Sequence, residues 1–136
     1  MRRLLPVLVL LLAMLAAPAE AAKLRIAMIP KGTTHVFWKT VEAGARAAAA
    51  DLDVELVWKG PLKENDRGQQ IAIVEQFVTE GVSAIILAPL DAVALRRPVA
   101  MAAQRKIPVV IFDSALQGGS RQRLCKPRGH RQPPRR

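Results

Sequence analysis

The chain has 136 residues and a formal net charge of +10, a balance that by itself favours a nucleic-acid-binding protein. The charge is unevenly distributed, however, because residues 22–119 hold twelve basic and ten acidic side chains, whereas residues 120–136 hold seven basic and none that is acidic. The middle of the chain is therefore close to neutral, and its aromatic residues do not alternate with a basic stripe, so we expect no nucleic acid as its partner. The single cysteine, Cys125, excludes an intrachain disulfide and a metal site built on cysteine spacing.

The first 21 residues have the pattern of a secretory signal peptide. Two arginines, Arg2 and Arg3, precede an apolar run of twelve residues, 4–15, and small residues then lead to Ala22. The run is shorter than the roughly 20 residues that a membrane-spanning helix needs. We therefore expect cleavage near Ala21 and a periplasmic location, with a buried core helix or an uncleaved anchor as the alternative.

Between residues 24 and 113, short apolar runs alternate with segments of helical periodicity. Strands are predicted at residues 24–29, 54–58, 82–88 and 107–112, and helices at 36–52, 65–80 and 92–106. The second helix has a capping signal at Asn65 and Asp66, and Gly81 follows it where a left-handed residue is wanted. Pro98 divides the third helical segment, so we expect a short turn before it and a helix that begins near it.

The spacing of apolar residues also predicts which side of each helix faces the core. The expected core face of the first helix consists of Phe37, Val41, Ala45, Ala48 and Leu52. The expected core face of the second consists of Ile71, Val74 and Val78, with Phe77 beside them.

The alternation of strands and helices with short connections predicts an α/β fold: a three-layer parallel sheet with helices on both faces. A flavodoxin-like sheet would have the strand order 2-1-3-4. The later strands are continuously apolar, which indicates burial on both faces.

In open parallel sheets, ligands bind where the strands end. The loops at that edge contain carboxylates, hydroxyls and aromatic rings, a combination that suits a polyhydroxylated ligand, since an aromatic ring covers the apolar face of a sugar while carboxylates accept bonds from its hydroxyls. The candidate ligand-binding residues are Thr34, His35, Phe37, Trp38, Asp91, Asp113 and Ser114.

Most of these residues also have a structural interpretation. Asp91 is a good cap for the turn that follows it, and His35 is a good cap or surface residue at the start of the first helix. Core packing is favoured for Phe37, which leaves Trp38 as the better stacking candidate, unless it only covers the loop. Asp113 is the strongest candidate, because an acid directly after a buried strand is hard to explain by packing; its alternative is capping of the next turn.

The sequence lacks the motifs of common enzymes and cofactor sites. It contains no G-x-G-x-x-G, no G-x-x-x-x-G-K-[ST], no G-x-S-x-G and no H-E-x-x-H. We therefore expect that the protein is not an enzyme and that it holds no cofactor and no metal.

Several stretches resemble the opening part of ribose-type periplasmic binding proteins of ABC transporters. They lie in order over residues 23 to about 119, and they are KLRIAMIPK, HVFW, EAGA, GVSAIILAPLD and IPVVIFDS. The resemblance implies a protein in which two α/β lobes close around a sugar or similar solute and deliver it to a membrane permease. It also implies that this chain encodes only part of the N-terminal lobe, because the family needs roughly twice its length.

The resemblance assigns roles to some of the candidate residues. In the family, the loop after the first strand supplies polar and aromatic contacts, and these map to Thr34, His35, Phe37 and Trp38. The acid after the fourth strand commonly bonds sugar hydroxyls and maps to Asp113. An arginine often follows that acid in ribose binders, whereas Ser114 stands here, so ribose itself is not the expected ligand.

Three segments follow from these observations. Residues 1–21 are the expected signal peptide, residues 22–119 a partial N-terminal lobe, and residues 120–136 a basic disordered tail that a shifted reading frame or an artificial end of the gene would explain. The favoured function is the extracytoplasmic sugar-binding component of an ABC import system, impaired as a fragment. The alternatives are a small exported flavodoxin-like cofactor binder or enzyme and, after it, a basic-tailed adhesion or nucleic-acid-binding protein.

Overall fold

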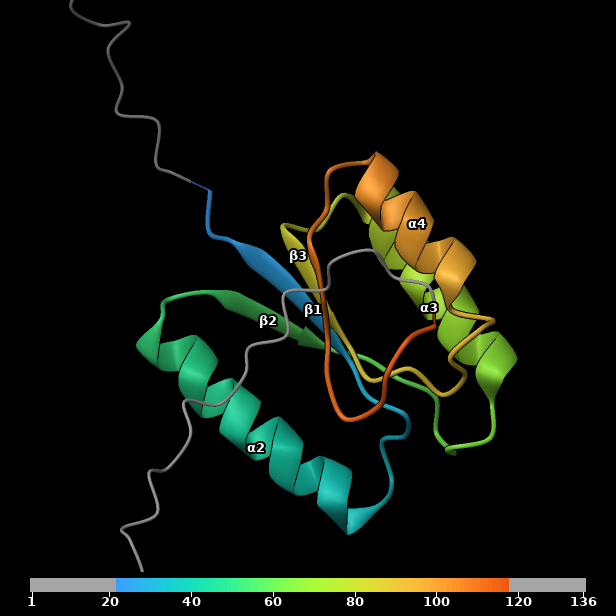
Figure 1. Cartoon of the computed structure of the whole chain (residues 1–136). Helices are drawn as coiled ribbons and strands as arrows, with labels where there is room; N and C mark the ends of the chain where they lie inside the picture. The colour runs from blue at the N-terminus through green and yellow to red at the C-terminus, as the bar shows by residue number, and fades with distance from the viewer. Residues whose placement is uncertain (1–21, 118–136) are drawn as a thin grey trace, which may run out of the picture.

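A computed structural model describes residues 22–117, so the expected signal peptide and the basic tail lie outside the described residues. Strands and helices alternate along this part of the chain, as predicted (Figure 1). The elements are β1 (Arg25–Ile29), α2 (Val36–Asp51), β2 (Glu55–Trp58), α3 (Arg67–Glu80), β3 (Ala84–Leu87), α4 (Arg96–Gln104) and β4 (Val109–Ile111).

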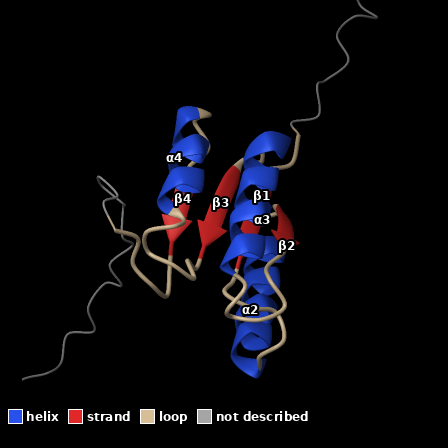
Figure 2. Ribbon diagram, turned by 90° about the vertical axis from the view of Figure 1, so that its right-hand side faces the viewer, coloured by secondary structure: helices blue, strands red, loops and turns tan. Residues whose placement is uncertain are grey.

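The four strands form one sheet in the order β2-β1-β3-β4, and every neighbouring pair is parallel. Figure 2 shows the arrowheads of β3 and β4 pointing the same way, with α3 and α4 in front of one face of the sheet. The remaining helix, α2, lies on the opposite face (Figure 1). The predicted three-layer parallel fold with strand order 2-1-3-4 is therefore confirmed.

The helix ends follow the signals in the sequence. Asp66 caps α3 by accepting a hydrogen bond of 2.8 Å from the backbone N–H of Gln69. Gly81 ends the same helix with a φ of 69°, a left-handed conformation that glycine adopts without steric penalty. The last helix begins at Arg96, which places Pro98 in its first turn, where the missing N–H would have no intrahelical partner.

The main core lies between the sheet and the pair α3 and α4. Its fully buried large side chains include Val74, Phe77, Ile85, Leu87 and Leu95. Burial of this apolar surface is the main force that holds the two helices on the sheet.

The predicted core face of α2 is wrong in its rotation. Phe37 and Leu52 are 51% and 71% exposed, whereas Trp38 and Ala49 are 2% and 8% exposed. Most other side chains of this helix are small, so the largest one decides which side turns inward. Trp38 buries more apolar area than Phe37 would, and its indole N–H donates to Oε1 of Glu64 at 2.8 Å.

The prediction that the fourth strand is buried on both faces is also wrong. Val110, at the centre of β4, is 45% exposed. The described helix on that face, α2, packs chiefly against β2 at the opposite edge of the sheet. Among residues 22–117, no helix covers the β4 half of this face.

Candidate functional site

The fold brings the loops after β1 and β4 together at the carboxyl end of the strands. Lys31 follows β1, and its Nζ atom lies 2.7 Å from Oδ2 of Asp113, which follows β4. The same Nζ donates to Oγ of Ser114, and this hydroxyl donates to Oδ2 of Asp113 at 3.2 Å. Two predicted site residues, Asp113 and Ser114, therefore form one cluster with a lysine that the sequence analysis had not selected.

The backbone at Asp113 is strained. Its φ is 64°, and the N–H of Ser114 donates to the carbonyl of Phe112 at 2.7 Å, which closes a three-residue turn. A left-handed conformation costs a non-glycine residue about 1–2 kcal/mol. Strain of this kind is common at functional sites, and here it accompanies a carboxylate held at the edge of the sheet.

The capping alternative for Asp113 does not fit this geometry. In the described part of the chain, its carboxylate contacts the side chains of Lys31 and Ser114 and accepts no backbone N–H. The side chain is 32% exposed, so one side of the carboxylate faces solvent at the edge where a ligand would approach.

The burial of Phe37 and Trp38 is the reverse of the prediction, in which Phe37 packs in the core and Trp38 is free to stack on a ligand. The ring of Phe37 is half exposed, and it meets the buried ring of Trp38 edge to face, at 4.9 Å between centroids and 76° between planes. Trp38 in turn lies 6.2 Å from Phe112. Phe37 is therefore the ring that can stack on a ligand, and the buried ring of Trp38 packs against it.

Two further predicted site residues fix the loop between β1 and α2. His35 is the N-cap of α2, where its Nδ1 atom accepts the backbone N–H of Phe37 at 3.2 Å. Thr34 donates its hydroxyl to the carbonyl of Leu62 at 2.9 Å and so ties this loop to the one after β2. Both side chains are exposed, and both have a structural task in this loop.

The capping interpretation of Asp91 is confirmed. Its Oδ1 atom accepts the backbone N–H groups of Val93 and Ala94, each at 2.8 Å, and its Oδ2 atom accepts a bond of 3.0 Å from Arg67. The pKa of Asp91 is lowered to about 2. The largest cause is the hydrogen bond from the N–H of Ala94, followed in size by those from the N–H of Val93 and the guanidinium of Arg67. The carboxylate is therefore ionised at neutral pH and already engaged on both oxygens.

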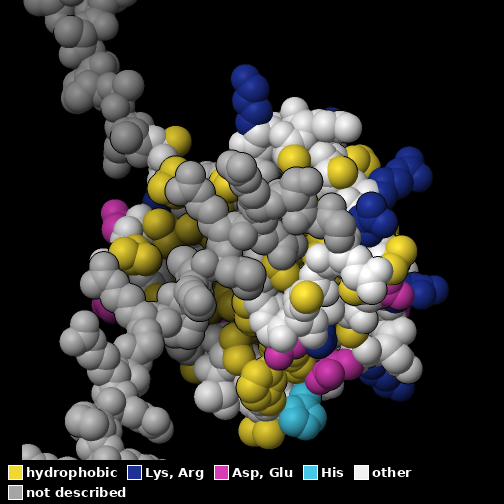
Figure 3. Space-filling model, in the orientation of Figure 1, with side chains coloured by type: hydrophobic (Ala, Val, Ile, Leu, Met, Phe, Trp, Pro, Cys, Tyr) yellow, Lys and Arg dark blue, Asp and Glu magenta, His cyan; other side chains and the backbone are white. Residues whose placement is uncertain are grey.

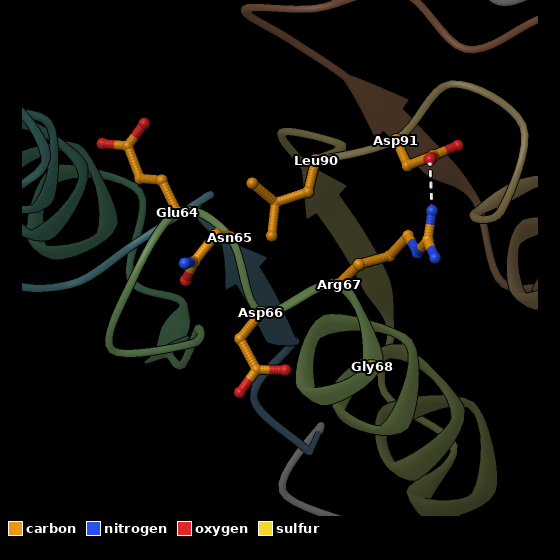
Figure 4. Close-up of a pocket in the computed structure, with 7 residues that line it drawn as sticks. All are labelled: Glu64, Asn65, Asp66, Arg67, Gly68, Leu90 and Asp91. Carbon is orange, nitrogen blue, oxygen red and sulfur yellow. Dashed lines mark hydrogen bonds and ion pairs between the residues drawn. The ribbon is translucent and has the colours of Figure 1, made fainter.

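Asp91 lines a hollow of about 380 Å³ at the start of α3, and none of Lys31, Asp113 and Ser114 is among its lining residues. Figure 4 shows the residues that line it. The lining residues are Glu64, Asn65, Asp66, Arg67, Gly68, Leu90 and Asp91. The charged groups in it have partners: Glu64 accepts from Trp38, Asp66 caps α3, and Arg67 pairs with Asp91. We therefore place the candidate ligand site at Asp113 and not in this hollow.

A buried glutamine, Gln70, joins the loops after β1 and β3 by hydrogen bonds. The sequence analysis did not identify this role. Gln70 is fully buried, and its Nε2 atom donates to the carbonyls of Pro30 at 3.0 Å and Ala88 at 2.9 Å. Its Oε1 atom accepts the N–H of Leu90 at 2.8 Å. Glutamine is usually exposed, so its position within an otherwise regular helix gave no signal of this role.

Within residues 22–117, no group of three or more His, Cys, Asp and Glu side chains is placed to hold a metal ion. The helices of the same part of the chain all lack the length and apolar character that crossing a bilayer requires.

Comparison with known proteins identifies the architecture. Residues 26–125 match the family described as periplasmic binding protein domain. The D-ribose/D-allose-binding protein of Pseudomonas aeruginosa is 39% identical over 94 residues, which cover 68% of this chain and 30% of that protein.

Solved structures agree with this match. A solute-binding protein of an ABC transporter from Agrobacterium vitis, with bound D-fucose, superimposes with a TM-score of 0.67 and 39% identity, over 69% of this chain and 33% of that one. A carbohydrate transporter solute-binding protein from Agrobacterium radiobacter, in complex with D-arabinose, gives a TM-score of 0.68 and 38% identity, over 71% and 32%. The chain thus spans about a third of the length of these relatives. The matches confirm the resemblance that the sequence indicated and favour a binding protein over an enzyme.

Proposed function

The chain belongs to the periplasmic binding protein domain family, and from this premise we propose that it supplies one half of the sugar site of an ABC import system. The supporting observation is the cluster of Lys31, Asp113 and Ser114 at the carboxyl edge of the sheet. The half-exposed ring of Phe37 is linked to the residue before Asp113 through Trp38, which contacts both Phe37 and Phe112.

The chemistry of this cluster suits a neutral polyol. Asp113 accepts hydrogen bonds, Lys31 donates them, and Ser114 does both, which matches hydroxyl groups that donate and accept in turn. The ammonium has three N–H groups, of which two serve Asp113 and Ser114, so a third remains for a ligand. The paired charges of Lys31 and Asp113 cancel, and the ring of Phe37 can cover the apolar face of a sugar.

Lys31 also accounts for the departure from the ribose-type pattern. The resemblance places an arginine directly after the acid, whereas this chain has Ser114 at that position. The positive charge comes instead from the loop after β1, since Nζ of Lys31 contacts both Asp113 and Ser114. We propose that this exchange shifts the preference away from ribose and toward another pentose or hexose. The sugars named with the relatives, D-allose, D-fucose and D-arabinose, are the first to test.

The proposed place of action is the periplasm, with a membrane permease as the partner that receives the solute. The signal-peptide pattern of residues 1–21 and the family match support this proposal. The location and the permease partner are proposed for the whole binding protein. This chain spans about a third of the length of its relative.

As a separate polypeptide, we propose, the chain binds its sugar poorly. Binding proteins of the clamp type hold the solute between two lobes, and closure removes it from water. On an open half-site, each hydrogen bond competes with solvent and contributes only about 1 kcal/mol.

The test of the site uses a chimera in which residues 22–117 replace the aligned stretch of the Pseudomonas aeruginosa relative. Loss of a charged hydrogen-bond partner costs about 1.5–3 kcal/mol, so Asp113→Ala is expected to weaken binding of the preferred sugar about 10- to 150-fold in titration calorimetry. Asp53→Ala is the matched control, because Asp53 also has a positive φ of 51° and also pairs with a lysine, Lys23. Equal affinities of the Asp113→Ala variant and the parent chimera would remove Asp113 from the site.

A further inference from the structure

The positive charge of the folded part is concentrated in one segment. Of the twelve basic side chains in the middle of the chain, four lie in residues 92–112, a segment that contains α4 and no acid. The other described residues hold the remaining eight basic side chains and all ten acids, a net charge of −2. The four basic residues of the α4 segment are exposed, and they are Arg96, Arg97, Arg105 and Lys106. Figure 3 shows Lys and Arg side chains along the right-hand margin, where α3 and α4 lie in Figure 1.

These four side chains differ from most other basic residues in their partners. Five of the other eight form ion pairs within residues 22–117, namely Lys23, Arg25, Lys31, Arg46 and Arg67. In the same part of the chain, none of the four pairs with an acid, and Arg105 donates instead to the carbonyl of Val78. The acids of the neighbouring helix α3 are Glu75 and Glu80, and Glu80 pairs with Arg25. The described fold therefore leaves the charge of the α4 segment without ion pairs.

The start of α4 departs from the usual charge pattern of helices. The N-terminal end of a helix dipole is positive, so acids stabilise the first turn and cations destabilise it. The first turn of α4 has no acid and contains both Arg96 and Arg97, and the N-cap residue Leu95 makes no side-chain capping bond. Local rules are broken in this way chiefly at functional sites, where another gain compensates. The two arginines therefore fit a role in binding better than a role in stability.

The arrangement of the charges restricts the partner. Arg96 and Arg105 lie at opposite ends of α4, about 14 Å apart along the helix axis, so the charges are spread and do not converge on one point. None of the four basic residues lines the hollow at the start of α3. Between the two ends, the helix exposes the small or polar side chains Ala100, Ala103 and Gln104, and it lacks the aromatic anchors that dominate interfaces between proteins. Such a face fits an extended anionic surface better than a small anion or a protein pocket.

We infer that the outer face of α4, with Arg96 and Arg97 at one end and Arg105 and Lys106 at the other, binds an anionic lipid surface. Each basic side chain near such a surface strengthens binding about fivefold, and its long stem lets the charge reach the headgroups. The opposite side of α4 packs on the core through Pro98 and Ala102, so binding requires no change of fold. For a binding protein, the contact would keep the solute close to the membrane of its permease. The inference goes beyond the sugar site and does not require it.

The experiment measures co-sedimentation of residues 22–136 with vesicles of phosphatidylglycerol and phosphatidylcholine in equal parts. Arg96→Gln with Arg97→Gln is expected to weaken binding about tenfold or more, and high salt or pure phosphatidylcholine should abolish it. The matched control is Lys39→Gln with Arg46→Gln, which removes two charges from α2 on the opposite face and should change the affinity less than about threefold. Residues 120–136 are the same in all variants, so their charge adds a constant contribution. Unfolding in urea checks that both variants are folded.

A second readout locates the contact on the molecule. In a chain with Cys125→Ser, the thiol of Ala100→Cys on α4 is expected to react with a maleimide about threefold or more slowly once the anionic vesicles are added, while that of Ala43→Cys on α2 keeps its rate.

Three results would overturn the inference. Equal affinities of the α4 variant and the parent would show that residues 120–136 alone bind the lipid, and an equal loss in the α2 control would show that only net charge matters. An α4 variant that loses binding to soluble polyglutamate but not to vesicles would assign the face to an acidic protein instead.

Discussion

The Nζ atom of Lys31 lies 2.7 Å from Oδ2 of Asp113, and this contact joins the loops after β1 and β4 across the end of β3. Because both partners of this contact belong to the chain itself, the contact holds in place the acid that would accept sugar hydroxyls. A pre-positioned group loses less conformational freedom on binding, which favours affinity once the second half of the site is present.

The strain at Asp113 predicts an unusual order of stability among its variants. Asp113→Gly and Asp113→Ala both lose the carboxylate, but glycine accepts the φ of 64° without steric penalty. We expect the glycine variant to be more stable by about 1 kcal/mol in urea unfolding. At Asp51, the last residue of α2, the order should be reversed, because glycine is a poorer helix former than alanine. A glycine variant at position 113 that is no more stable than the alanine variant would show that the strain is absent.

Gln70→Leu is expected to destabilise the chain by about 3 kcal/mol or more. The change leaves the carbonyls of Pro30 and Ala88 and the N–H of Leu90 without their buried partner, and each unsatisfied group costs about 1–3 kcal/mol. Gln69→Leu is the control, because Gln69 is exposed and its side chain makes one hydrogen bond, which it accepts from the N–H of Leu62. Unfolding in urea measures both, and similar losses for the two variants would contradict the role of Gln70.

The sequence predicted those parts of the fold that local rules determine. Asp66 and Gly81 marked the ends of α3, because capping depends on neighbours in the chain. The rotation of α2 could not be predicted, since the choice between Phe37 and Trp38 depends on Glu64, which is distant in the sequence.

The candidate site was predictable to a similar extent. Its place at the carboxyl edge and the prominence of Asp113 followed from the order of the strands. Lys31 was visible in the sequence directly after the first strand, but its partnership with Asp113 depends on a sheet in which β3 lies between β1 and β4. The task of Gln70 depends in the same way on carbonyls that only the folded sheet brings together.

The low pKa of Asp91 predicts how stability depends on pH. The folded pKa is about 2 and the usual value is about 3.8, so the stabilisation is complete above pH 4 and declines as the pH falls toward 2. Asp91→Asn keeps an oxygen that can cap but lacks the titrating charge. The difference between the urea midpoints of parent and variant should therefore shrink between pH 4 and pH 2. A constant difference over this range would contradict the assigned pKa.

Residues 1–22 are expected to export a fused reporter that is active only outside the cytoplasm. Their positive start, apolar run and small residues before Ala22 are the features that the secretion machinery recognises. Leu10→Arg together with Leu11→Arg should abolish export, because the charges interrupt the apolar run. Retention of the unchanged fusion in the cytoplasm as the full precursor would refute the signal-peptide interpretation.

The most direct test of the half-site is a thermal melt of residues 22–136 with a panel of pentoses and hexoses at millimolar concentration. Stabilisation by a ligand depends on the ratio of its concentration to Kd, so a weak half-site predicts midpoint shifts below about 1 °C for every sugar. In the chimera completed with the Pseudomonas aeruginosa relative, one sugar of the panel should raise the midpoint by several degrees. A sharp transition of residues 22–136 alone that one sugar raises by several degrees would contradict the account, because it would show a complete receptor within this chain.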